Sequence, residues 1–366
     1  MRFSCNVAEL NEALSIAFHA IPVKSAKAVL EGIQIEAQRD SIVLTSTDLT
    51  MGIECHVHAN VEEEGSVVLP GRFFCEIARK LPGTEVDISI NERYLASISS
   101  FQFRTTIAGM DALEFPELPS IKGQTVQLTE KQLKQLINGT LFSVAVDESR
   151  PILTGCLFEI ENQNIKVVAL DGYRLAICKD TLDLSGDTIR AVIGGKILGD
   201  VAKILSDSED PVTLTFSRSH VSFKIGENQI IARLLEGEYM KYNQIISDDY
   251  LTRISIKRVE LMEAMDRAML IGRESKSSLV TFKVDSYSSR LIILMPNTGM
   301  EEKLDISCEG KDLEIAFNVK YMMDILKSIS DEEINIRFKK NINPCIIYPT
   351  DESDRYLYLI LPVRVS

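Results

Sequence analysis

The stretch RFFCEIARKL at Arg72–Leu81 returns as KILGDVAKIL at Lys196–Leu205 and as KYMMDILKSI at Lys320–Ile329, at equal intervals along the chain. In register, the three stretches share a base at the first position, an acid at the fifth, an aliphatic residue at the sixth and a second base at the eighth. Self-similarity at a fixed spacing is the signature of a repeat architecture. The sequence therefore predicts three copies of one domain.

Two further landmarks keep the same order and spacing. Each copy opens on a short alternating strand that leads into an amphipathic helix, beginning near Phe3, Val126 and Ile254. Later in each copy an apolar strand ends in a polar turn. The turn residues are Asp48, Asp171 and Asn297. Short polar or Gly-containing connecting segments separate the copies, so we predict domains at 1–123, 124–250 and 251–366.

Alternating strands separated by a few residues follow each repeated helix, which is typical of antiparallel meanders. Each copy should hold two helices and about eight strands, an α+β domain with its helices on one sheet face. In the first copy the last predicted strand includes Phe101–Phe103, which would place Phe101 and Phe103 on one face.

Composition places limits on location and chemistry. The 366 residues are 45% hydrophobic, yet no apolar run approaches the length that spans a bilayer. Glu9 and Glu12 in the first predicted helix are wrong for a cleavable signal. Seven Cys residues without a Cys-x-x-Cys pair favour reduced core thiols in a cytoplasmic protein.

The formal net charge is −13, which taken as an average argues against nucleic acid. Acids, however, gather in turns, whereas the repeated helices keep bases at i and i+7, which share one helical face. One interpretation is a solvated helix whose acid pairs with the flanking bases. These acids are Glu76, Asp200 and Asp324. The other is a basic surface that holds duplex DNA through its phosphates without reading sequence.

Catalysis finds little support. His56 and His58 share one strand face, but no third metal ligand lies at a usable spacing, so solvent-facing polar residues are the simpler interpretation. Gly194-Gly195-Lys196 lacks the remaining residues of a phosphate-binding loop. We predict no catalytic residue, no metal and no cofactor.

Four segments carry a resemblance to a known family: LTSTDL at Leu44–Leu49, Phe115-Pro116, DGYRLA at Asp171–Ala176 and LPVR at Leu361–Arg364. From Met1 to Arg364 the chain resembles the bacterial DNA sliding clamp, the beta subunit of the replicative DNA polymerase III holoenzyme. The resemblance implies a crescent of three domains that closes into a ring as a head-to-tail homodimer around duplex DNA. It also implies a processivity factor without enzymatic activity, and the replicative polymerase, the clamp loader and other clamp-binding peptides as partners.

In that family, clients dock a short peptide in a pocket between the second and third domains. The matching positions are Leu153, Leu170, Gly172, Tyr173, Arg174, Leu175, Met240, Gln244, Ile245, Leu359, Leu361, Pro362, Val363 and Arg364. An apolar floor would take aliphatic and aromatic anchors, and Arg174 and Arg364 would orient the peptide. Leu170, Met240 and Gln244 stand where the family often has Thr, Pro and a base, so client preference should differ. Pro362 in the final apolar run suggests an edge strand.

The repeated helices and two loops would contact DNA. The predicted residues are Lys24, Arg72, Arg79, Lys80, Arg150, Lys196, Lys203, Lys320 and Lys327. Around Arg150, Pro151 and Ile152 replace aromatics often found in the family, so the contact there should be weaker.

For the dimer, the resemblance pairs an edge strand of the first domain with one of the third. The predicted apolar centre is Phe101, Phe103, Leu270 and Ile271. A sequence-specific DNA-binding regulator is the alternative function, but it needs base-reading side chains on an exposed helix, and no helix here stands out for them.

Overall fold

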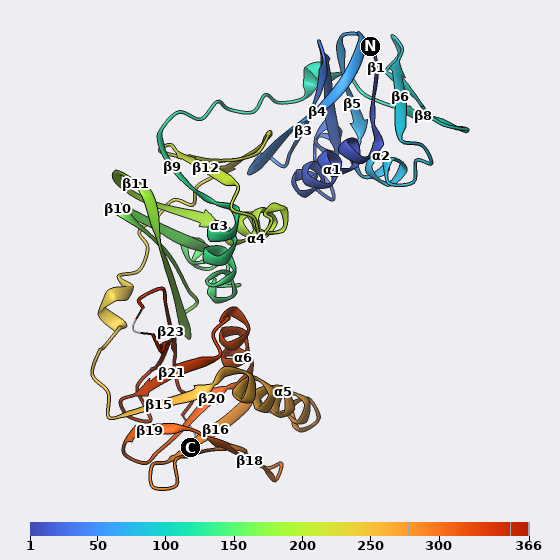
Figure 1. Cartoon of the computed structure of the whole chain (residues 1–366). Coiled ribbons are helices and arrows are strands. Elements are labelled where there is room, and N and C mark those ends of the chain that lie inside the picture. The colour runs from blue at the N-terminus through green and yellow to red at the C-terminus, as the bar shows by residue number, and fades with distance from the viewer. Residues whose placement is uncertain (277, 352, 365–366) are drawn as a thin grey trace. The chain divides into compact units, whose positions relative to one another are not determined.

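The structure is a computed structural model that describes residues 1–364 except 277 and 352, leaving the side chains of 183–187 aside. It divides into two compact units, one made of Met1–Lys131 with Lys203–Leu234 and the other of Gln132–Ala202 with Leu235–Ser366. Each copy runs as one strand, a helix, two or more strands, a second helix and several more strands (Figure 1). No helix in the described part of the chain is long and apolar enough to cross a membrane.

A twelve-stranded antiparallel sheet runs through the first unit in the order β8-β7-β6-β1-β4-β14-β13-β12-β9, with β3, β2 and β5 continuing beside β4. Its strands from the first copy are β1 (Arg2–Asn6), β2 (Gly32–Gln38), β3 (Ser41–Thr47), β4 (Met51–Glu63), β5 (Gly65–Pro70), β6 (Glu85–Ile90), β7 (Leu95–Ser100) and β8 (Phe103–Ala108). Those from the second copy are β9 (Gln124–Thr129), β12 (Pro211–Phe216), β13 (His220–Ile225) and β14 (Asn228–Arg233). The antiparallel pair of β4 and β14, with Ile53 opposite Ile230, joins strands of two copies into one sheet.

Two helices pack against this sheet, α1 (Val7–Ala17) and α2 (Gly71–Ala78). The Asn6 side chain caps α1 by accepting from the N–H groups of Ala8 and Glu9. The buried face of α1 carries Leu10 and Leu14, one helical turn apart, and burying a side chain of this size stabilises the fold by roughly 1.5–3 kcal/mol. The predicted amphipathic helix is therefore present and faces the sheet.

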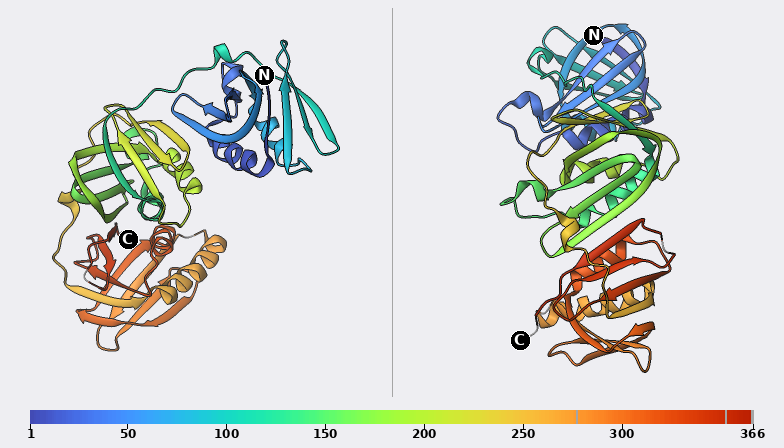
Figure 2. Two further views of the ribbon diagram at one scale, coloured as in Figure 1. Left: turned by 45° about the horizontal axis from the view of Figure 1, so that its top comes forward. Right: turned by 90° about the vertical axis from the view of Figure 1, so that its left-hand side faces the viewer.

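In the second unit, a seven-stranded sheet has the order β10-β11-β23-β22-β21-β15-β19, and a four-stranded sheet has the order β18-β17-β16-β20. The first comprises β10 (Gly155–Leu170), β11 (Arg174–Gly194), β15 (Thr252–Lys257), β19 (Ser307–Gly310), β21 (Glu333–Phe338), β22 (Cys345–Pro349) and β23 (Tyr356–Ile360). The second comprises β16 (Leu279–Asp285), β17 (Arg290–Met295), β18 (Met300–Asp305) and β20 (Leu313–Asn318). The long hairpin of β10 and β11 is green in Figure 2.

The remaining helices are α3 (Glu130–Asn138), α4 (Gly195–Ile204), α5 (Arg258–Ser275) and α6 (Val319–Ser328). Helices α5 and α6 lie side by side and contact strands of both sheets of the second unit (Figures 1 and 2). Helices α2, α4 and α6 are the three repeated stretches of the sequence. The first of them is shorter than predicted, because Arg79, Lys80 and Leu81 continue in tight turns past its end at Ala78.

Polar turns repeat with the copies. Asp48 accepts hydrogen bonds from the backbone N–H groups of Thr50 and Met51, and Asp171 does the same for Tyr173 and Arg174. Asn297 adopts a positive φ of 62° in the matching turn of the third copy. Asp and Asn favour such positions because their short side chains bond the nearby backbone and tolerate the left-handed region.

Cysteines other than Cys308 are buried, and no described cysteine is in a disulfide. Burial raises the pKa of Cys5, Cys55, Cys156 and Cys178 to about 12, and that of Cys75 to about 11. The protonated thiol is thus favoured in the folded chain more than in the unfolded chain, whose thiols ionise near the ordinary value of 9.0. Stability from these groups is complete below pH 9 and is lost as the pH rises toward 12.

We therefore expect alkaline destabilisation. At pH 10 each of these buried thiols should lower the free energy of unfolding by about 1.4 kcal/mol relative to pH 8. Thermal unfolding at the two pH values measures the effect. Cys308→Ala is the control, because the half-buried Cys308 should contribute little to the difference. An unchanged melting temperature between pH 8 and pH 10 would contradict the assignment.

Candidate functional site

Arg72 and Arg79 share one face of the α2 turn, as the i and i+7 spacing predicts. Both guanidinium groups lie over the ring of Phe18, at 4.9 and 5.6 Å from its centroid, and Arg72 also donates to the Ile21 carbonyl at 3.2 Å. Both residues are exposed. The aromatic ring therefore holds two exposed cations close together.

Each of the other predicted DNA-contacting bases is also exposed. Lys80 follows α2, Lys196 and Lys203 lie on α4, and Lys320 and Lys327 lie on α6. Lys24 and Arg150 lie in loops between the regular elements. The repeated pattern thus places exposed bases on three equivalent helices.

The predicted pairing of the acid with its flanking bases is wrong for α6. Asp324 accepts from Arg174 Nη1 at 2.7 Å, a residue far away in the sequence, instead of pairing with Lys320 or Lys327. On α2, Glu76 makes no ion pair among the residues that the structure describes. The physical reason on α6 is that a guanidinium buried against the helix needs a carboxylate more than exposed lysines do.

The Arg174 guanidinium is engaged by several groups besides Asp324. Its Nε donates to Asp171 at 2.9 Å, its Nη2 donates to the Phe142 carbonyl, and its guanidinium lies over the Tyr321 ring at 4.5 Å. Only 9% of the side chain is exposed. The prediction that Arg174 orients a bound peptide directly is therefore not supported by its contacts, because the charged group is already engaged within the chain.

Four predicted pocket residues come together in one buried apolar cluster. Leu153, Leu170, Leu175 and Leu359 pack there with the aromatic side chain of Tyr242 among others. The register of β11 and β23 sets Leu175 opposite Leu359. The structure therefore brings these four residues together in a deeply buried cluster, and their role as the floor of a client pocket stays a prediction.

Four predicted pocket residues are exposed and lie one to three residues along the chain from members of this cluster. Tyr173 is 61% exposed, and Met240, Ile245 and Leu361 are also among the exposed large hydrophobic residues. Gly172, which precedes Tyr173, has φ 92°, a conformation that L side chains rarely adopt, with open space where a Cβ would lie. Tyr173, Met240, Ile245 and Leu361 are called the apolar rim below.

The last residues of the pocket lie outside regular structure. Strand β23 ends at Ile360 and lies between β11 and β22, so the edge strand suggested by Pro362 is wrong. Pro362 follows the strand, where its missing N–H costs no ladder bond. Leu361 donates its N–H to the Tyr173 carbonyl and Val363 donates to the Ala316 carbonyl, both at 2.8 Å, while Arg364 and Gln244 are exposed.

A hydrogen-bond network fixes the rim segment η6 (Tyr242–Ile245). The Tyr242 hydroxyl donates to Glu159, which also pairs with Lys166 at 3.5 Å and Arg190 at 3.4 Å. Burial, reinforced by Glu159, raises the pKa of Tyr242. The protonated phenol therefore persists as a donor and ties η6 to β10 and β11.

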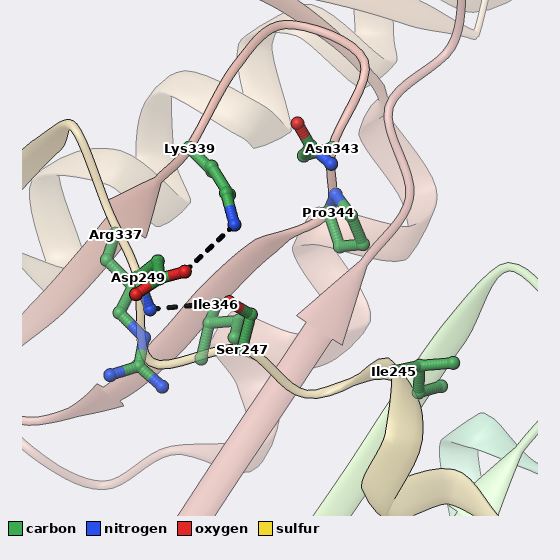
Figure 3. Close-up of a pocket in the computed structure, with 8 residues that line it drawn as sticks. All are labelled: Ile245, Ser247, Asp249, Arg337, Lys339, Asn343, Pro344 and Ile346. Atoms are coloured by element: carbon green, nitrogen blue, oxygen red, sulfur yellow. Dashed lines mark hydrogen bonds and ion pairs between the residues drawn. The ribbon is translucent and has the colours of Figure 1, made fainter.

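Beside Ile245 lies a small cavity of about 100 Å³. Figure 3 shows Lys339 pointing to Asp249 across it, with the Asn343-Pro344 turn on the opposite wall. The Lys339–Asp249 pair is 3.1 Å long, and Arg337 pairs with Asp248 at 2.9 Å. Because both aspartates are largely exposed, these pairs contribute little stability.

Sequence reasoning missed two aromatic residues of this region. Tyr321 on α6 lies 6.1 Å from the Tyr173 ring, and Phe142 lies 5.4 Å from the Arg174 guanidinium. Tyr321 occupies the second position of the repeated stretch, where its counterparts Phe73 and Ile197 are both apolar. That shared apolar character was the one signal in the sequence that could have indicated the contact.

Of the predicted dimer residues, Phe101 is not in a strand. It lies in the turn between β7 and β8 at φ 53°, and it is 81% exposed. Phe103 begins β8, which ends the sheet of the first unit. Leu270, 65% exposed, and the half-buried Ile271 lie on α5, which continues past them to Ser275. Ser99, Ser100 and Gln102 around Phe101 are compatible with a strand or with a turn, and the structure has the turn.

The two histidines considered for a metal site lie on the surface. His56 pairs with Glu54 at 3.1 Å and His58 with Glu9 at 3.8 Å, and both rings are exposed, as expected of solvent-facing strand residues. No group of three or more His, Cys, Asp or Glu side chains that could hold a metal ion occurs within the described part of the chain.

Three family models match the chain in succession. They describe the N-terminal, central and C-terminal domains of the DNA polymerase III beta subunit, at residues 1–119, 127–241 and 243–364. The beta sliding clamp of Staphylococcus aureus is 35% identical over 369 residues, covering 98% of this chain and 97% of that protein.

Solved structures agree with the family models. The DNA polymerase sliding clamp of Bacillus subtilis is 33% identical with a TM-score of 0.95, and both chains are covered completely. A DNA polymerase III beta subunit of Eubacterium rectale is 33% identical with a TM-score of 0.94, again over the whole of both chains. With three tandem clamp domains matched in order, the chain belongs to the beta subunit family of DNA polymerase III, the beta sliding clamps, and is a non-catalytic processivity factor of the polymerase.

Proposed function

We propose that two copies of this chain close head to tail into a ring around duplex DNA and hold polymerase, clamp loader and other clients through the apolar rim. The observation that carries the proposal is the exposed base at equivalent places on three equivalent helices, α2, α4 and α6. A duplex carries about one negative charge per 1.7 Å of its axis, so such bases hold it by its phosphates whatever its sequence. We also propose a cytoplasmic location, in keeping with the buried thiols.

The nine exposed bases of the prediction remain our candidates for DNA contact. Arg72 and Arg79 support this role best, since the Phe18 ring holds both cations near each other without neutralising them. Membership of the family supports this sequence-independent mode over a sequence-specific regulator. Domain boundaries at 1–123, 124–250 and 251–366 remain part of the proposal. The third family match begins at residue 243, ahead of the proposed boundary.

For ring closure we propose the free edges of β8 and β18. Each ends its sheet and is paired on one side among the described residues. Phe101 precedes β8 and has a left-handed backbone conformation, which costs a non-glycine residue about 1–2 kcal/mol. Such strained residues cluster at functional positions. Leu270 lies on α5 close to β18, because Arg267 of the same helix pairs with Glu302 of that strand.

For clients we propose the exposed rim of Tyr173, Met240, Ile245 and Leu361 over the buried cluster. A short peptide with aliphatic or aromatic anchors fits such a surface, which offers apolar area and few charges. Leu170 is buried within the cluster, so a substitution there would change the floor of the client surface. Met240 and Gln244 are exposed, so substitutions there would change contacts with the bound peptide directly.

The test of the proposed function is topological. We expect the protein, once loaded by its cognate loader, to stay on nicked circular DNA and to leave when the same circle is linearised. Retention is measured by gel filtration of the DNA with labelled protein. Equal loss from the circle and the linear form would contradict enclosure, and equal retention on both would indicate ordinary binding.

A further inference from the structure

The acid of the repeated stretch on α6 lies within one helical turn of both DNA-facing lysines. In sequence, Asp324 is four residues after Lys320 and three before Lys327, the two spacings at which opposite charges pair on a helix surface. An acid free to pair with either lysine would neutralise charge on the helix face proposed to contact DNA. Instead, its carboxylate is bound by Arg174.

This ion pair is held firmly in place. The Arg174 guanidinium is fixed by Asp171 on one side, by the Phe142 carbonyl on another and by the Tyr321 ring beneath it. A charge buried to this extent is stable only with its partners in position, and removing one partner leaves the other uncompensated. Arg174 therefore has no low-energy alternative to Asp324 and Asp171.

The Arg174–Asp324 pair affects the two lysines of α6. Lys320 and Lys327 are exposed, and their side chains make no hydrogen bond or ion pair among the residues that the structure describes. Their positive charges thus remain available although an acid stands one turn away. We propose that Arg174 is a positioning residue for DNA contact, which acts by engaging Asp324 and so leaves Lys320 and Lys327 free for phosphate. The inference rests on the proposed function, in which α6 faces the duplex.

The proposal is tested through the salt dependence of DNA binding. A linear duplex of about 20 base pairs enters a closed ring by its end, so no loader is needed. Fluorescence anisotropy across a series of KCl concentrations gives the slope of log K against log salt, whose magnitude is about 0.9 for each phosphate that the protein neutralises. We compare wild type with Arg174→Met, Asp324→Asn and the double variant.

Three results are expected. Arg174→Met should reduce the magnitude of the slope by roughly one, because the released Asp324 now pairs with Lys320 or Lys327 and one phosphate contact is lost. Asp324→Asn should leave the slope unchanged, since Arg174 already occupies that acid in the wild type. The double variant should recover the wild-type slope. A merely structural role for Arg174 predicts that the double variant stays as weak as Arg174→Met.

Other outcomes overturn the proposal. A steeper slope for Asp324→Asn alone would mean that the acid acts on the lysines despite Arg174, and this variant is informative even if Arg174→Met fails to fold. Lys320→Gln with Lys327→Gln separates the two levels of inference: if that variant keeps the wild-type slope, α6 does not contact DNA and the proposed DNA surface fails there. Circular dichroism and sedimentation confirm that each variant compared is folded and assembled.

Discussion

A double variant with Leu270→Asp and Ile271→Asp is expected to sediment as a monomer at concentrations where the wild type is a dimer. Both side chains lie on α5 beside the edge strand β18, and we propose that they meet Phe101 and Phe103 of the other copy. Burying carboxylates in an apolar joint costs several kcal/mol, and about 3 kcal/mol per joint weakens association more than a hundredfold. Sedimentation velocity measures the result.

A head-to-tail ring makes a sharper test possible. Because each joint uses a different surface from each copy, Phe101→Asp with Phe103→Asp should also give a monomer. Mixing the two variants should restore a dimer, since one joint between their intact surfaces remains. That dimer is an open ring, so it should leave nicked circular DNA as quickly as linear DNA.

The control is Tyr287→Asp, at an exposed turn residue outside both proposed surfaces. It should sediment as the wild type does. Two findings would remove the assignment: either double variant remaining a dimer by itself, or the folded variants staying monomeric when mixed.

The fold was predictable because its determinants are local and occur three times. The repeated stretches become α2, α4 and α6, and the alternating runs after Leu205 and Ile329 become antiparallel strands, as expected of meanders. Asp48 and Asp171 bond the backbone two and three residues ahead, an interaction fully contained in a short peptide. Such features need no knowledge of tertiary structure.

Long-range contacts were not predictable in the same way. Asp324 has two lysines at helical pairing distance, and nothing in the sequence indicates that Arg174 competes for it from a distant strand end. Phe101 and Phe103 alternate as a strand would, yet the chain turns at Phe101 with a positive φ, which propensity disfavours for an aromatic residue. In both cases tertiary packing overrides a pattern that is reasonable locally.

The candidate pocket was predictable in part. Its residues came from a resemblance in short segments, and the structure gathers Leu153, Leu170, Leu175 and Leu359 into one cluster. Their degree of burial and the aromatic contact of Tyr321 with Tyr173 depend on how α6 lies against β11, which the sequence does not specify. Residue identity was therefore accessible, whereas the division into buried base and exposed rim was not.

That division identifies the substitution with the largest expected effect on client binding. Ile245→Asp changes a rim side chain that is exposed in the free chain, so the fold should tolerate it, in contrast to a change at the buried Leu175. In a bound state the same position would be covered by the peptide, where a carboxylate is desolvated and an apolar contact is lost. A hot-spot loss of about 2–4 kcal/mol corresponds to a weakening of roughly thirty- to a thousandfold.

The measurement is the anisotropy of a fluorescent peptide that carries the clamp-binding segment of the cognate polymerase. Leu113→Asp is the matched control, because Leu113 is as apolar, is exposed, and lies in the short 3-10 helix η3 (Ala112–Glu114) of the first unit, outside the rim. Its peptide affinity should equal that of the wild type. Wild-type affinity for Ile245→Asp would exclude this residue from the client surface. Equal weakening by both variants would indicate loss of folding, which the thermal unfolding curve of each variant resolves. Since the rim and the Arg174–Asp324 pair are distinct groups, Ile245→Asp should leave the salt slope of DNA binding intact, which separates client docking from enclosure of the duplex.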